Sequence, residues 1–167
     1  MLSIGRANAL GRTPEVVEAV LADPRRLDEL LSCYDRPEEG VRLRASNALK
    51  RIERARPAVI ADRAADVLEA LMRTDQPSAR WTLAQLALRL GDAMGPGLRN
   101  RTLQAMKEGL EGSDDWIVLT QTVATLSAWA GRDPVLLRWL RPRLERLSAD
   151  HRKAISGRAR KALDALS

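Results

Sequence analysis

Nucleophilic and metal chemistry have few candidate residues in this 167-residue sequence. Cys33 is the single cysteine and His151 the single histidine, so the chain has neither an internal disulfide nor a His/Cys set with metal-ligand spacing. A nucleophile activated by a neighbouring base also needs more than these two side chains. We expect Cys33 to pack as a small hydrophobe at a helix end and His151 to be an exposed first-turn residue. The sequence therefore predicts a non-catalytic protein without cofactor or metal.

Four carboxylates lie close together in the sequence, at Glu108, Glu111, Asp114 and Asp115. Their spacing does not form the compact cage of oxygen ligands that a hard cation requires. The two glutamates fall on the surface of a predicted helix, and the two aspartates precede the helix that begins near Trp116, where acidic residues act as N-caps. We interpret this cluster as surface and cap residues.

A row of polar side chains recurs at one helical position and is the strongest candidate for a binding site. Amide groups both donate and accept hydrogen bonds, so such a row can satisfy the backbone of an extended peptide whatever its sequence. Arginines recur beside this row and suit carboxylate or phosphate groups. The predicted partner-binding residues are Asn8, Arg12, Leu43, Asn47, Arg51, Arg54, Trp81, Gln85, Arg89, Gln121, Thr125 and Lys161. The alternative is that Trp81 packs partly between helices and that the amides are merely solvated.

The elements that must position these residues follow from a repeat of about 38 residues. Equivalent apolar positions are Leu10, Leu49, Ala87, Leu126 and Leu163, at steps of 39, 38, 39 and 37. A second series, Leu31, Leu71, Leu110 and Leu147, has steps of 40, 39 and 37. Two interleaved series with one period predict two helices per unit in a stacked architecture. Ala (25) and Leu (26) dominate and Phe is absent, which indicates an all-α fold.

Proline and cap residues give the expected helix boundaries in a single domain over residues 1–167. The expected helices span 3–12, 14–22, 24–33, 38–54, 58–73, 77–91, 97–111, 115–130, 134–147 and 150–166. Pro142 falls inside the ninth helix, where it should kink or split it.

Two segments resemble HEAT repeats. One is Asp35-Arg36-Pro37-Glu38-Glu39-Gly40-Val41-Arg42, and the other is Asp75-Gln76-Pro77-Ser78-Ala79-Arg80, each followed by apolar positions of an inner helix. The resemblance implies a right-handed α-α superhelix (a HEAT-like solenoid) of about four to five helical repeats, whose inner helices line a concave binding face. We interpret Asp35, Arg42, Asp75 and Arg80 as structural pairs between repeats.

The charge pattern indicates the kind of partner. The sequence has 28 basic and 22 acidic residues, for a net charge of +6, and the excess is concentrated in residues 41–56 and 138–161. We therefore expect a scaffold whose concave face binds a protein partner, either acidic or extended. The segment Arg80–Leu86 is similar to the tryptophan and asparagine pair by which armadillo repeats of nuclear import adaptors hold peptides, with Gln85 in place of the asparagine.

Nucleic-acid binding is the alternative function. Phosphate contacts would come from Arg51, Arg54, Arg89, Arg158 and Lys161, with Trp81 or Trp116 stacking on a base. Asp114, Asp115 and Trp116 also resemble residue types of HEAT-like alkylpurine DNA glycosylases, but no longer motif of that family is matched. Because no apolar run approaches the length of a membrane span and the first residues do not resemble a signal peptide, we expect a cytoplasmic protein that does not bind membranes. The oligomeric state stays open.

Overall fold

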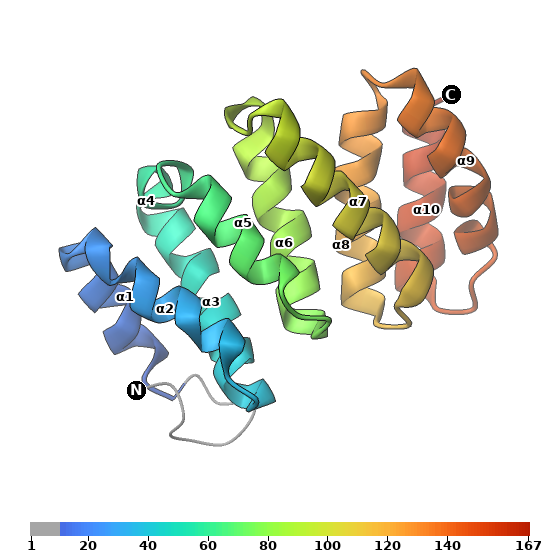
Figure 1. Ribbon diagram of the computed structural model, residues 1–167. Coiled ribbons are helices and arrows are strands. Elements are labelled where there is room, and N and C mark those ends of the chain that lie inside the picture. The colour runs from blue at the N-terminus through green and yellow to red at the C-terminus, as the bar shows by residue number, and fades with distance from the viewer. Residues whose placement is uncertain (1–10) are drawn as a thin grey trace.

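The computed structural model describes residues 11–167, apart from the side chain of Asp92 (Figure 1). Within this range the regular structure is entirely helical, which confirms the all-α prediction. The α-helices are α1 (Thr13–Ala22), α2 (Leu27–Leu31), α3 (Glu39–Ala55), α4 (Pro57–Ala61), α5 (Ala64–Met72), α6 (Pro77–Leu90), α7 (Pro96–Gly112), α8 (Trp116–Ala130), α9 (Pro134–Ser148) and α10 (Lys153–Ala165). The expected helix 3–12 and the candidate residue Asn8 lie outside the described residues.

Helix starts follow the predicted signals. Four helices after the third begin with proline as their first residue, where the missing N–H would have no intrahelical partner. The Asp115 carboxylate accepts hydrogen bonds from the backbone N–H groups of Ile117 and Val118, each at 2.9 Å, and so caps α8. Asp133 caps α9 in the same way. The boundaries of α3, α6, α7, α8 and α9 therefore lie within one residue of the expected ones.

Other expected boundaries were wrong. The expected helix 58–73 is two helices, because the chain breaks between α4 and α5 at Arg63, whose φ of −122° and ψ of 28° are not helical. The expected helix 24–33 is α2 flanked by short 3₁₀ turns at Pro24–Arg26 and Ser32–Asp35. Pro142 does not split α9, which continues from Pro134 to Ser148. Of the two aspartates expected as N-caps, Asp115 caps α8 and Asp114 does not.

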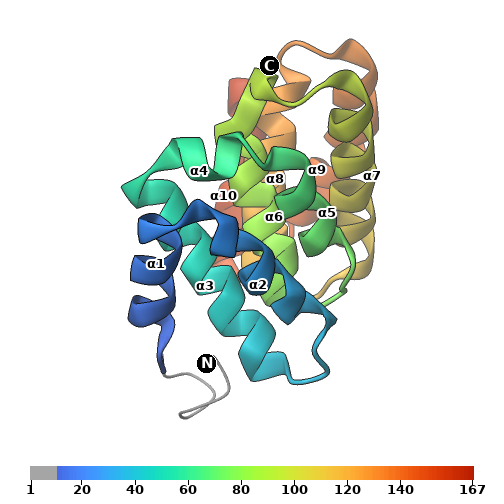
Figure 2. The same cartoon turned by 60° about the vertical axis from the view of Figure 1, so that its left-hand side comes forward.

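The helices form two layers (Figures 1 and 2). The inner layer consists of α1, α3, α6, α8 and α10, each in contact with the next along the chain. The outer layer consists of α2, α5, α7 and α9, which cover one side of the inner helices. Leu49, Leu68, Leu126 and Leu140 are fully buried in the core. The opposite side of the inner layer is left uncovered by the outer helices.

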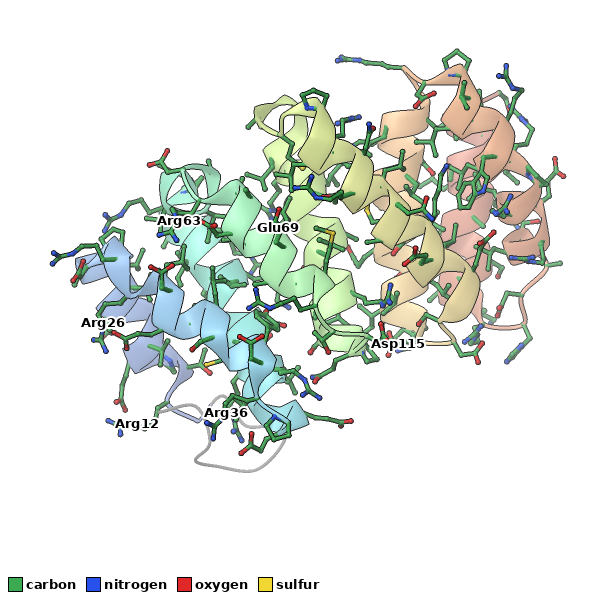
Figure 3. The ribbon with its side chains drawn as sticks, viewed as in Figure 1. Arg12, Arg26, Arg36, Arg63, Glu69 and Asp115 are labelled. Carbon is green, nitrogen blue, oxygen red and sulfur yellow. The ribbon has the colours of Figure 1, made fainter. Side chains whose placement is uncertain are left out.

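Arginine–carboxylate pairs connect successive outer helices. Arg63 at the start of α5 contacts Asp28 of α2 at 2.5 Å, and Arg101 of α7 contacts Glu69 of α5 at 2.6 Å. Arg143 of α9 donates from Nε to Glu111 of α7 at 2.8 Å. We call these three the outer ion pairs; Arg63 and Glu69 are labelled in Figure 3. Each arginine contacts a carboxylate 32 to 35 residues earlier in the chain.

Three of the four residues expected to pair between repeats do so, and the fourth, Asp75, pairs with Arg80, only five residues later in the chain. Arg42 donates to the side-chain oxygen of Gln76 at 2.5 Å, across 34 residues. Asp35 accepts from Arg73 at 2.9 Å, across 38 residues. Arg80 contacts Asp75 at 2.6 Å and also donates to a backbone carbonyl of α7. Asp35, Arg42 and Arg80 therefore connect neighbouring elements, whereas Asp75 stays exposed. No helix of the described part of the chain is long and apolar enough to cross a membrane.

Candidate functional site

The uncovered side of the inner layer carries a first groove, with a volume of about 170 Å³. Three inner helices supply its lining, and none of it comes from the outer layer. The 3.6-residue helical period brings side chains three or four positions apart to one face, so Lys50 and Arg54 of α3 lie together on that face. The lining residues are Lys50, Glu53, Arg54, Gln85, Leu86, Leu88, Arg89 and Gln121.

A second groove, of about 420 Å³, lies between α8 and α10. Its lining residues are Trp116, Thr120, Gln121, Ala154, Gly157, Arg158 and Lys161. Because Gln121 lines both grooves, they adjoin along the inner layer from α3 to α10. We call the two grooves together the inner trough.

The inner trough is strongly positive. Five of its lining side chains are cationic and one, Glu53, is anionic. Glu53 is buried, and its carboxylate contacts Arg89 at 3.1 Å. Arg54, Arg158 and Lys161, in contrast, form no ion pair with any residue that the structure describes. The trough therefore presents cations whose charge no described carboxylate neutralises.

Lys50 is held in an unfavourable environment for a cation. Burial and the nearby guanidinium of Arg54 lower the pKa of its ammonium group. Its Nζ lies 5.6 Å from the ring centroid of Trp81, a distance at which a cation–π attraction offsets part of this cost. Lys50 thus lies over one face of the half-buried Trp81 ring.

Five of the predicted partner-binding residues meet in the inner trough. They are Arg54, Gln85, Arg89, Gln121 and Lys161. They come from α3, α6, α8 and α10, which adjoin in this order in the inner layer. The helical periodicity of the sequence therefore placed these five side chains on one face, the uncovered side of the inner layer.

Other predicted residues lie elsewhere. Thr125 is buried, and its hydroxyl donates to the backbone carbonyl of Ala84 at 2.7 Å, so its assignment to the binding face was wrong. Leu43 and Asn47 are half-buried on α3 and line neither groove, and Arg51 is exposed outside both. Arg12, before α1, is paired with Glu15 and also lines neither groove.

Sequence reasoning missed Glu53 and did not include Trp116 among the partner-binding residues. The signal for Glu53 was its spacing of 36 residues from Arg89, close to one repeat period. Trp116 is 52% exposed at the first position of α8. An exposed tryptophan is unusual in a chain whose other described large apolar side chains are mostly buried. Trp129 is buried in α8, whereas Trp139 is half-buried in the outer layer.

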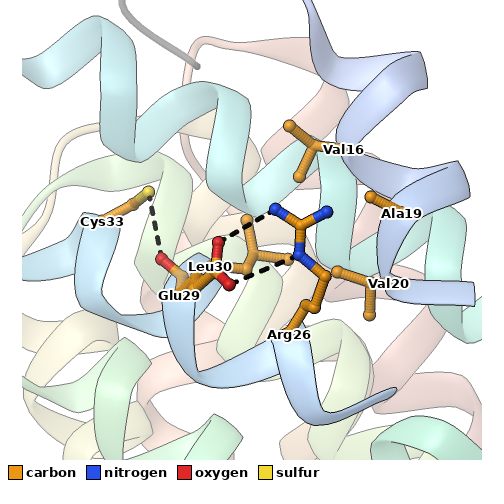
Figure 4. Close-up of a pocket in the computed structure, with 7 residues that line it drawn as sticks. All are labelled: Val16, Ala19, Val20, Arg26, Glu29, Leu30 and Cys33. Atoms are coloured by element: carbon orange, nitrogen blue, oxygen red, sulfur yellow. Dashed lines mark hydrogen bonds and ion pairs between the residues drawn. The ribbon is translucent and has the colours of Figure 1, made fainter. Parts of the chain in front are cut away.

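A separate cavity of about 140 Å³ lies between α1 and α2 (Figure 4). Its wall is mainly aliphatic, from Val16, Val20 and Leu30, and the Arg26–Glu29 ion pair lies at its edge. The thiol of Cys33 packs against this wall, and burial raises its pKa, so it stays protonated at neutral pH. This placement confirms that Cys33 packs as a small hydrophobe. His151 is exposed, as expected, but it precedes α10, which begins at Lys153 and not at residue 150, so it is not a first-turn residue.

The four clustered carboxylates have separate roles. Glu111 pairs with Arg143, Asp115 caps α8, and Glu108 accepts a hydrogen bond from Gln104 at 3.3 Å. Asp114 is exposed, and its backbone carbonyl accepts from Arg152 at 2.7 Å. The described residues contain no group of three or more side chains that could hold a metal ion.

The uncovered face of the inner layer thus combines exposed cations, amides and one exposed tryptophan. These side chains form the candidate binding site. A scan against protein-family models, a search of curated proteins and a search of solved structures each find no match to the chain.

Proposed function

We propose that the chain is a HEAT-like right-handed α-α superhelix of about four to five repeats that acts as a non-catalytic protein-binding scaffold. Contacts between side chains about one period apart support the repeat. The Arg73–Asp35 pair spans 38 residues, the Arg89–Glu53 pair spans 36 and the Arg42–Gln76 hydrogen bond spans 34. The order of the inner helices supports it as well, because each packs against the inner helix before and after it, as stacked repeats do.

The partner we propose is an acidic segment bound in the inner trough. One contrast carries this proposal: the arginines of the outer ion pairs are matched with carboxylates, whereas Arg54, Arg158 and Lys161 have no such partner among the described residues. Two pairs of like charges also lie within single helices: Lys50 with Arg54 on α3, and Arg158 with Lys161 on α10. Each such pair destabilises its helix by about 0.2–0.5 kcal/mol. An anionic partner would relieve this repulsion, which supports a binding role for these cations.

The trough suits an extended chain. Gln85 and Gln121 lie on neighbouring helices, and amides at this spacing can hydrogen-bond successive backbone groups of a peptide. From α3 to α10 the trough crosses three helix-to-helix intervals, each of about 8–10 Å. At about 3.3 Å per residue, an extended segment of about eight residues covers this distance.

Nucleic-acid binding is the second candidate, and Trp116 is the observation that favours it. An exposed tryptophan lies beside Arg158 and Lys161. Proteins bind single-stranded nucleic acids through this combination, in which a base stacks on the ring and phosphates contact the cations. Gln85 and Gln121 favour the first candidate instead, because amides on neighbouring helices match successive backbone groups of a peptide. We therefore rank the acidic protein segment first.

The test compares two fluorescent probes by anisotropy: a flexible peptide of Asp, Glu and Gly, and a mixed-sequence single-stranded DNA. We expect the peptide to bind the wild-type protein and the double variant Arg54→Gln/Lys161→Gln to bind it about tenfold more weakly, since two charge contacts are lost. The matched control is Arg138→Gln/Arg146→Gln, on exposed positions of α9 outside the trough. Equal weakening by the control would mean that net charge alone drives binding. Tighter binding of the DNA than of the peptide would favour the second candidate.

A further inference from the structure

We propose that the groove between Trp116 and the small residues Ala154 and Gly157 holds an aromatic side chain of the bound acidic segment. This inference rests on the proposed function and specifies the chemistry of the partner. The occupant is thus a protein segment with one aromatic anchor residue next to acidic residues.

The shape of the groove between α8 and α10 supports an anchor site. It is the larger of the two grooves, at about 420 Å³. One wall is Trp116, of which 52% is exposed, and α10 contributes Ala154 and Gly157 to the lining. An ideal Cβ atom at Gly157 would meet no other atom within 4 Å. The groove is therefore open at the point where a longer side chain on α10 would fill it.

The fold itself does not require glycine at position 157. Its φ is not positive, and no neighbouring group approaches closely enough to exclude a side chain. Glycine inside a helix is unfavourable relative to alanine, so this position weakens α10 without a packing reason. Space for a ligand side chain against Trp116 accounts for both the glycine and the exposed ring.

The charges around this groove indicate which residues of the bound segment lie next to its aromatic anchor. Arg158 and Lys161 line the same groove as Trp116, and neither pairs with a described carboxylate. Carboxylates adjacent to the anchor can therefore contact these cations while the anchor ring packs on Trp116. Aromatic pairs prefer offset-stacked or edge-to-face geometry, which an open groove beside an exposed ring allows. Gln121, shared with the first groove, continues the contact toward Lys50 and Arg54.

Two matched peptides test the anchor. Both contain Asp, Glu and Gly on either side of one central residue. That residue is Phe in one peptide and Ala in the other. We expect wild-type protein to bind the Phe peptide about tenfold more tightly. Gly157→Leu fills the groove and Trp116→Ala removes its ring wall, so each should abolish this preference. The ratio of the two affinities within each variant reports the anchor alone, because the charge contacts are common to both peptides.

Stability measurements separate blocking from misfolding. Gly157→Leu should unfold at the wild-type temperature or above, since leucine is the better helix former. Gly157→Ala adds a single methyl group and should retain most of the Phe preference. Equal binding of the two peptides to wild-type protein would overturn the anchor while leaving the charge-based function intact. Failure of both peptides to bind would remove the proposed function and the anchor with it. Trp116-dependent binding of the single-stranded DNA, without a Phe preference, would assign the groove to a base.

Discussion

Glu53 of α3 and Arg89 of α6 form an ion pair at 3.1 Å in the inner trough. The carboxylate is buried, while about half of the Arg89 side chain is exposed. Arg89 is thereby neutralised from within the protein, unlike Arg54 on the same groove wall. Glu53 is the single acidic residue that lines either groove, so it lowers the positive potential that an acidic ligand meets.

Removal of this charge should strengthen binding of acidic ligands. Glu53→Gln keeps the size of the side chain, deletes one negative charge from the trough and frees the guanidinium of Arg89 from its ion pair. We expect about fivefold tighter binding of the acidic peptide by anisotropy. The gain should shrink at high salt, which screens exposed charges. Unchanged affinity at low salt would mean that the ligand does not approach Glu53.

The outer ion pairs should stabilise the folded protein, whereas the cations of the inner trough should not. Arg143 contacts Glu111, and its Cζ lies 3.9 Å from the centroid of Trp139 with a quarter of the side chain exposed. We expect Arg143→Gln to lower the free energy of unfolding by about 1–2 kcal/mol. Arg54→Gln is the matched substitution on the inner layer and should be neutral or slightly stabilising, because it removes a like charge beside Lys50. Urea denaturation measures both, and a larger loss for Arg54→Gln would contradict the assignment of roles.

Thr125 should act as a link between α8 and α6 and not as a ligand contact. Thr125→Val keeps the shape of the side chain and removes the hydrogen bond to Ala84, which should cost about 0.5–1.5 kcal/mol of unfolding free energy. Thr82→Val is the control, since the hydroxyl of Thr82 bonds only within its own helix, to Ser78 at 2.7 Å. We expect the control to lose less stability. Peptide affinity should be unchanged in both, and weaker binding by a stably folded Thr125→Val protein would return Thr125 to the ligand site.

Asp150 should make stability depend on pH in the acid range. Hydrogen bonds from the side chain and backbone N–H of Arg152 hold the pKa of Asp150 well below its usual range. A carboxyl with a depressed folded-state pKa stabilises the fold above its unfolded pKa of about 3.9, and this contribution is lost as pH falls toward the folded value. Asp150→Asn should therefore be less stable than wild type at pH 7, with a difference that narrows below about pH 4. Thermal unfolding across pH measures this, and Asp164→Asn, at an exposed position of α10, is the control. A difference that stays constant down to pH 2 would contradict the linkage.

Local signals in the sequence determined most helix boundaries. Proline at a first helical position and aspartate at an N-cap act on backbone groups within three residues, so α8 and α9 could be placed without knowledge of the fold. The same holds for the exposed face of α6, because the 3.6-residue period alone puts Gln85 and Arg89 on one side. The composition, rich in Ala and Leu and without Phe, determined the all-α class.

Contacts between distant segments decided the rest. The break between α4 and α5 lies at Arg63, whose guanidinium contacts Asp28, 35 residues earlier, and no local signal marks that partner. Thr125 follows the polar pattern of the binding face, yet the rotation of α8 against α6 turns its hydroxyl onto the backbone of the neighbouring helix. Glu53 and Arg89 meet because α3 and α6 pack side by side. The sequence by itself determined the helices and their polar faces, since these depend on neighbouring residues. Only the tertiary structure decided which polar groups pair within the protein and which stay free for a partner, because that depends on how the helices pack.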